Sequence, residues 1–78
     1  MQEQEVLKLV AEYEEAKRAA FDKMLEKIAN KLIKPHRGEG DQAMIDAAYS
    51  AASVIEQQGA DDYGDHEEIA EQILGSFE

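Results

Sequence analysis

The feature that most constrains this chain is a run over residues 2–34 that contains neither glycine nor proline. The run is rich in Ala, Glu, Lys and Leu, which have high helix propensities. Acidic side chains dominate its first half and lysines its second half, the order that the helix dipole favours. Pro35 follows, and the residue before a proline disfavours the α conformation. We therefore predict a long helix over residues 1–35, about 50 Å long at about 1.5 Å per residue.

Hydrophobic residues recur along this predicted helix at steps of three and four, which marks one apolar stripe. The stripe consists of Val6, Val10, Tyr13, Ala20, Phe21, Met24, Leu25, Ile28 and Leu32. Lys17 falls within it, and the steps after Ala20 depart from the repeat of about 3.5 residues that a two-stranded coiled coil needs. We therefore expect a packed bundle rather than a coiled-coil rod, with Lys17 at the stripe edge or the helix bent near it.

Two shorter helices are predicted after a loop that contains Gly38 and Gly40. Asp41 is a suitable N-cap for a helix over residues 41–58, whose apolar side is rich in alanine and so predicts close approach to a neighbouring helix.

The last helix is predicted over residues 65–77 and is amphipathic. Asp65 is its expected N-cap, and Glu68, three residues later, completes a pattern like a capping box. The chain thus reads as an all-α, three-helix arrangement that forms a single domain over residues 1–78, with one long N-terminal helix and two shorter acidic ones.

Charge divides the chain into two unlike parts. Residues 1–37 hold all eight Lys and Arg together with seven acids, whereas residues 38–78 hold eleven acids and neither Lys nor Arg. Most soluble surfaces mix the two signs, so a surface of one sign indicates a basic partner or a need for solubility. A net charge of −10 and the lack of a basic face argue against direct binding of nucleic acid.

The acidic stretch "QGADDYGDHEE" at positions 58–68 resembles known motifs only in part. With Gly64 at the glycine position of an EF-hand loop, its first position would be Gly59, which offers no carboxylate. A carrier-protein attachment motif needs a serine where Asp62 stands. A weak calcium site of another kind stays open, but we predict no metal and no cofactor.

Nothing in the sequence indicates catalysis. The chain has no cysteine, its two histidines lie in separate loop regions, and no phosphate-binding glycine loop is present. We therefore expect a protein that is not an enzyme. No signal peptide or membrane-spanning run is visible, so the expected location is the cytoplasm, or the host cytoplasm if a phage encodes the chain.

The preferred hypothesis is a binding or inhibitor protein that presents an acidic helical face to a basic protein surface. Acids three or four residues apart on a helix are spaced by about 6 Å, the same order as neighbouring phosphates. In size, helical character and charge the chain resembles the small acidic inhibitors, anti-CRISPR and anti-restriction proteins among them, that phages and mobile elements direct against host nucleic-acid machinery. That resemblance implies mimicry of a nucleic acid toward a nucleic-acid-binding protein; no motif carries it and no residue is transferred from it. The predicted contact residues are Asp46, Tyr49, Glu56, Asp61, Asp62, Tyr63, Glu67, Glu68 and Glu71, with the two tyrosines as anchors.

An alternative hypothesis is a structural or regulatory module in which the acidity serves solubility only. Here the long helix forms a homodimer through apolar residues that extend beyond the two shorter helices: Val6, Leu7, Leu9, Val10 and Tyr13. A third possibility, a small regulator that binds another helical protein through an apolar groove, is equally compatible with the sequence.

Overall fold

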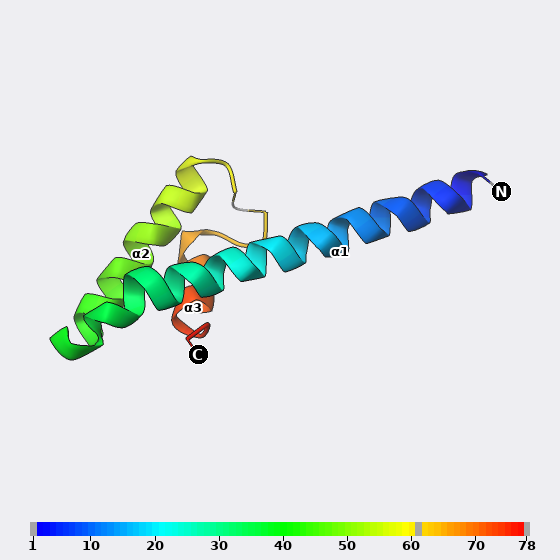
Figure 1. The fold of residues 1–78 in the computed structure, drawn as a ribbon. Helices are drawn as coiled ribbons and strands as arrows, with labels where there is room; N and C mark the ends of the chain where they lie inside the picture. Colours follow the sequence, from blue (N-terminus) through cyan, green and yellow to red (C-terminus); the bar gives the residue numbers. More distant parts are fainter. Residues whose placement is uncertain (1, 61, 78) are drawn as a thin grey trace.

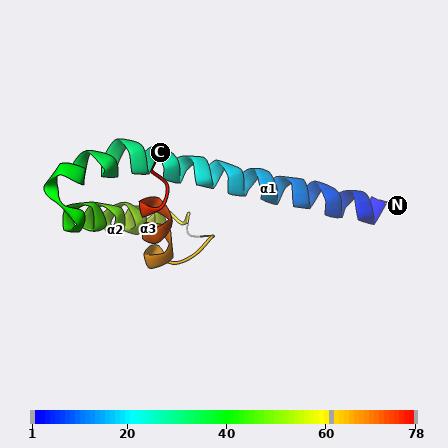
Figure 2. The same cartoon turned by 90° about the horizontal axis from the view of Figure 1, so that it is seen from below.

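The computed structural model describes residues 2–60 and 62–77, and these form an all-α, three-helix arrangement with no strand in either range. The helices are α1 (Gln2–Ile28), α2 (Asp41–Gln57) and α3 (His66–Leu74). The second half of α1 lies beside α2 and α3, while its first half projects away from them (Figure 1). Seen from below, α2 and α3 lie on one side of α1 only (Figure 2). The molecule is therefore elongated, with principal dimensions of 57 × 24 × 15 Å.

The long helix does not stop at Pro35 as predicted, but changes its helical geometry near its end. The α-helix ends at Ile28, a π-helical turn covers Ala29–Ile33, and a 3-10 helix follows over Lys34–Glu39. The turn is wide because the Lys34 N–H donates to the carbonyl of Ala29, five residues earlier. Pro35 then occupies the first turn of the 3-10 helix, where its missing N–H costs no hydrogen bond. The loop predicted after Pro35 is thus helical as far as Glu39.

The reversal between the long helix and α2 is made at Gly40, which corrects the prediction that Asp41 caps the second helix. Gly40 is the N-cap, with φ 102°, and Asp41 is already the first helical residue. Glycine adopts a positive φ without the steric penalty that a Cβ brings. No side chain caps this helix start. The close return of the chain here depends on glycine rather than on a carboxylate.

The predicted cap of the third helix is confirmed at Asp65, whose Oδ1 accepts a hydrogen bond of 2.9 Å from the Glu68 backbone N–H. The reverse bond of a capping box is not formed within the described ranges. The Glu68 carboxylate instead folds back over Gly64, with its Oε2 2.7 Å from the place that a Cβ on Gly64 would occupy. The helix ends at Leu74, earlier than the predicted end at 77.

The core lies where α2 and α3 cover the second half of α1. Its buried residues are Phe21, Leu25, Ala29, Ile33, Ala48, Ala52, Ile55, Ile69, Ala70 and Ile73, each 8% exposed or less. The most extensive contact is between α2 and α3, where Ala48, Ala52 and Ala70 are fully buried, so the alanine-rich face does allow close approach. The described residues include no buried polar or charged one.

Only part of the predicted apolar stripe of α1 enters this core. Phe21 and Leu25 are buried, and Met24 and Ile28 pack against them. Every residue from position 2 to position 16 is exposed. The radius of gyration of 15.4 Å reflects this projecting segment, since a compact domain of this length would have about 11.5 Å.

Candidate functional site

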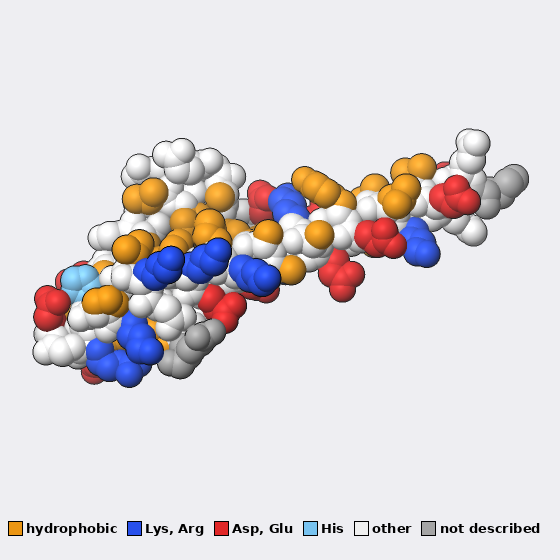
Figure 3. Space-filling model, viewed as in Figure 1, with side chains coloured by type: hydrophobic (Ala, Val, Ile, Leu, Met, Phe, Trp, Pro, Cys, Tyr) orange, Lys and Arg blue, Asp and Glu red, His pale blue; other side chains and the backbone are white. Residues whose placement is uncertain are grey.

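The first half of α1 is a helix without packing partners inside the described molecule. Residues 2–16 extend about 22 Å from the body at about 1.5 Å per residue. Their large hydrophobic side chains are 50–65% exposed: Val6, Leu7, Leu9, Val10 and Tyr13. Figure 3 shows hydrophobic side chains along one edge of this projecting segment. A contiguous apolar patch of this kind marks an interaction surface more often than single exposed residues do.

Four of these residues face the same side of the helix. Val6 is followed by Leu9 and Val10, three and four residues later, and Tyr13 follows these two at spacings of four and three. At about 3.6 residues per turn the four side chains form one stripe. We call these four residues the free stripe. Leu7 projects from a different side of the helix.

Acidic side chains border the free stripe along both edges. Glu5 and Glu12 lie on one edge and Glu3 and Glu14 on the other, at about 3.6 residues per turn. Residues 2–16 carry five acids and one base, Lys8. The surface is therefore apolar along its middle and negative along its rims.

The free stripe continues into an apolar groove between α1 and the segment that precedes α3. Ala20, Phe21 and Met24 line the groove from α1, and Ala60 and Tyr63 line it from the facing segment. Met24 lies five helical turns of about 3.6 residues beyond Val6, so the groove and the stripe open on the same side of α1. We call this hollow the α1 groove.

A salt bridge closes the rim of the α1 groove. Lys17 Nζ lies 2.7 Å from Asp62 Oδ2, and both side chains are partly exposed. The hydrogen bond to the Asp62 carboxylate raises the pKa of Lys17 above its ordinary value of 10.5. Lys17 thus sits in the apolar stripe where a carboxylate from the facing segment meets it, and α1 continues past it as an uninterrupted α-helix. Its unexpected position was the only sequence signal for this contact.

Tyr63, predicted as an exposed anchor, is packed against the core instead. Its ring lies 4.9 Å from that of Phe21, centroid to centroid, and the Arg18 guanidinium carbon lies 4.5 Å above it. The Tyr63 hydroxyl oxygen is buried and has no hydrogen-bond partner within residues 2–60 and 62–77. The apolar body of the ring gains more from the hydrophobic contact than an exposed position would give it. Arg18, which the sequence reasoning did not single out, also donates to the Gln72 Oε1 at 3.2 Å.

Two of the predicted contact residues come together where α2 ends near the start of α3. Glu56 Oε2 accepts from the His66 backbone N–H at 3.1 Å and lies 3.2 Å from the His66 ring Nδ1. Tyr49 is 37% exposed, and its ring centroid lies 6.4 Å from that of His66. His66 therefore links them, a role that its sequence position did not reveal.

The other predicted acidic residues differ in whether they already have an ion-pair or hydrogen-bond partner within the molecule. Asp62 pairs with Lys17, and Asp46 accepts from Gln42 at 2.9 Å. Glu67 and Glu71 are exposed on α3 and form no ion pair within the described ranges. Asp61 lies outside the described residues. The nine predicted residues are thus not one continuous free surface, because several of them stabilise the body itself.

The described residues contain no cluster of three or more His, Cys, Asp or Glu side chains that could hold a metal ion. No helix within residues 2–60 and 62–77 is long and apolar enough to cross a membrane. No protein-family model, no curated protein and no solved structure matches this chain.

Proposed function

We propose that this chain is a helical association module, a non-catalytic binding protein whose binding element is the first half of α1. One observation carries the proposal: residues 2–16 are all exposed, although they include Val6, Leu7, Leu9, Val10 and Tyr13. Covering apolar surface contributes about 25 cal/mol per Å² removed from water, so these side chains favour a partner.

The projecting half of α1 would also gain stability from such a partner. Residues 2–16 continue the packed half of α1, but most helical stability in proteins comes from packing of an amphipathic face, which these residues lack. The free stripe offers the spacing by which one amphipathic helix lies along another or in a groove. A helical partner that is apolar along its middle and basic along its edges would fit the acidic rims.

A photo-reactive residue tests this proposal inside the cell that makes the protein. Tyr13→p-benzoylphenylalanine keeps an aromatic ring on the free stripe, and Glu15→p-benzoylphenylalanine places the same group on the opposite side of the same turn. We expect a covalent adduct of defined mass from position 13 and a much weaker one from position 15. Equal adducts from both positions, or none from either, would overturn the proposal.

A second candidate function is supported by the exposed acids of α3. Glu67 and Glu71 are one turn apart, exposed and without an ion pair in the described ranges, and Tyr49 is exposed where α2 meets α3. Asp46, which accepts a hydrogen bond from Gln42 within α2, completes the group of residues considered for this second function. In this function the chain is an inhibitor of the anti-CRISPR type, which engages a basic surface of a nucleic-acid-binding protein as a nucleic-acid mimic.

A peptide rich in Lys and Arg is a suitable probe for this second function. In ¹⁵N-labelled protein we expect the peptide to shift the amide signals around Asp46, Glu67 and Glu71, and added salt to reverse the shifts. The double variant Glu67→Lys with Glu71→Lys should lose them. Shifts of equal size at Glu12 and Glu14 would show attraction to negative charge in general and would contradict a specific acidic face.

A further inference from the structure

We propose that the partner of the free stripe is a second copy of this chain, bound antiparallel so that each free stripe lies over the α1 groove of the other copy. The inference rests on the proposed association function and specifies its partner. It commits to one geometry, in which Tyr13, Val10 and Val6 of one copy face Lys17, Ala20 and Met24 of the other.

The spacing of the two surfaces is complementary in this direction. Counted backward from Tyr13, the stripe positions follow at steps of three and four, to Val10 and Val6. Counted forward from Lys17, the groove positions follow at the same steps, to Ala20 and Met24. Two antiparallel helices therefore bring each stripe residue opposite one groove residue.

Side-chain sizes also fit this arrangement. Ala20 is small and exposed and leaves room for Val10, while Met24 is partly buried and offers a flexible apolar contact for Val6. The Tyr13 ring would lie along the aliphatic stem of Lys17, whose ammonium group points to Asp62 at the groove rim. The stripe and the groove face the same side of α1. A two-fold axis between the two copies therefore lets each free stripe contact the α1 groove of the other copy.

Charge selects the antiparallel direction over the parallel one. Residues 2–16 hold five acids and one base, whereas residues 17–34 hold six bases and two acids. A parallel pair would place two negative segments side by side, which like-charge repulsion disfavours. An antiparallel pair places each negative segment along the positive half of the other copy.

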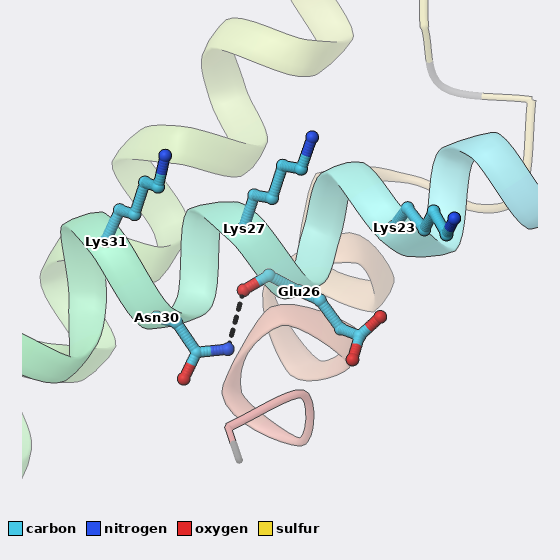
Figure 4. A pocket seen from close by; sticks show the side chains of 5 residues that line it. All are labelled: Lys23, Glu26, Lys27, Asn30 and Lys31. Atoms are coloured by element: carbon cyan, nitrogen blue, oxygen red, sulfur yellow. Dashed lines mark hydrogen bonds between the residues drawn. The ribbon is translucent and has the colours of Figure 1, made fainter.

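Specific lysines meet the acidic rim in this geometry. Five turns of about 3.6 residues separate Glu5 from Lys23, so the two project from the same side of α1 and face each other across a two-fold axis. Lys27 lies one turn further. Lys23, Lys27 and Lys31 extend along the outer surface of α1, with α2 and α3 behind it (Figure 4). All three are exposed and form no ion pair within residues 2–60 and 62–77.

Sedimentation equilibrium of the purified chain is the first test. We expect a monomer–dimer equilibrium, with a dissociation constant at least tenfold higher for Val10→Glu and unchanged for Glu15→Lys, which lies on the opposite side of the helix. A chain that stays monomeric at all concentrations, or a dimer that Val10→Glu leaves intact, would overturn the inference.

A charge exchange tests the antiparallel pairing directly. Glu5→Lys alone and Lys23→Glu alone should each weaken the dimer several-fold. Both substitutions in one chain should restore the dissociation constant to within about twofold, because each copy then offers a lysine to the new glutamate of the other. Additive weakening in the double variant would contradict the pairing.

Cysteine cross-linking tests the register, since the chain has no cysteine of its own. Val10→Cys with Ala20→Cys should oxidise to a covalent dimer, and each single variant should remain monomeric on a denaturing gel. The two positions lie about 15 Å apart on one helix, too far for a disulfide within the chain. Efficient cross-linking of Val10→Cys alone would indicate a parallel dimer and overturn the inference.

These outcomes separate the inference from the function on which it rests. A monomeric purified chain that still forms a position-13 adduct with a different protein in the cell overturns the second-copy partner and leaves the association function standing. A monomeric chain without any specific adduct at position 13 overturns both.

Discussion

Lys17 Nζ and Asp62 Oδ2 lie 2.7 Å apart, and this contact joins α1 to the segment that leads into α3. The contact places one positive charge inside an apolar stripe at the point where the stripe passes from the projecting half of α1 to the packed half. It also forms the rim of the α1 groove.

The Lys17 contact predicts a loss of stability in alkaline solution. Because the pKa of Lys17 is raised in the folded state by its hydrogen bond to Asp62, the charged form stabilises the fold, and this contribution is complete below the unfolded value of about 10.5. It is lost as the pH rises through the higher folded pKa. Above about pH 10.5, denaturant unfolding should therefore show a larger decrease in the free energy of unfolding for the wild type than for Lys17→Met. Identical pH profiles for the two proteins would contradict this prediction.

The Tyr63 hydroxyl predicts an unusual response to mutation. A buried hydroxyl without a hydrogen bond costs about 1–3 kcal/mol, so Tyr63→Phe should leave the free energy of unfolding unchanged or raise it by about 1 kcal/mol. Tyr63→Ala removes the ring contacts with Phe21 and Arg18 as well and should lower it by about 3 kcal/mol. Chemical denaturation followed by circular dichroism measures both. A marked loss of stability in Tyr63→Phe would mean that the hydroxyl has a partner.

The N-cap of α3 predicts a local loss of stability. Asp65→Ala removes the acceptor of the Glu68 N–H and should lower the free energy of unfolding by about 1 kcal/mol. Asp65→Asn keeps an acceptor and should cost much less. Glu67→Gln, in the same turn, removes a charge without removing a cap and should cost only about 0.3–0.5 kcal/mol. An equal effect of Asp65→Ala and Asp65→Asn would show that charge, not the cap bond, stabilises this helix start.

One substitution in the core and one on the free stripe should separate effects on stability from effects on association. Ile73→Ala removes a fully buried side chain from the core and should lower the free energy of unfolding by about 2–5 kcal/mol. Leu9→Ala truncates a side chain that is 63% exposed and should change it by less than about 0.5 kcal/mol in dilute protein. Thermal unfolding at low and high protein concentration measures both effects. At high concentration Leu9→Ala should lose the added stability that the wild type gains from association.

The helical class and most of the helix positions follow from local sequence. The run without glycine or proline, the acids at helix starts and the cap at Asp65 act within a few residues of themselves, so the sequence predicts them without knowledge of the fold. The start of α2 was predicted less well, because Asp41 has the chemistry of a cap but the chain reversal needs the positive φ of Gly40. The end of the long helix also differs, because a widened turn lets the chain pass Pro35 in helical form.

The candidate site was predictable only in part. The hydrophobic residues of the first half of α1 were recognised as a possible dimer surface from their sequence alone. Their actual exposure depends on where α2 and α3 dock, and both pack on the second half of the helix (Figures 1 and 2). The acidic residues were recognised as a group, but Tyr63 and Asp62 were assigned to a free surface that the structure uses for internal contacts with Phe21 and Lys17.

The sequence by itself determined that this chain forms helices, where most of them lie, and that its charge is balanced in residues 1–37 and negative beyond. Those properties arise from propensity, capping and composition, each of which acts locally. Only the tertiary structure decided which half of the apolar stripe is buried, which carboxylate meets Lys17, and which tyrosine faces the core. Those outcomes depend on contacts between segments far apart in the chain, and a hydrophobic stripe along α1 is the same pattern whether a neighbouring helix covers it or leaves it free for a partner.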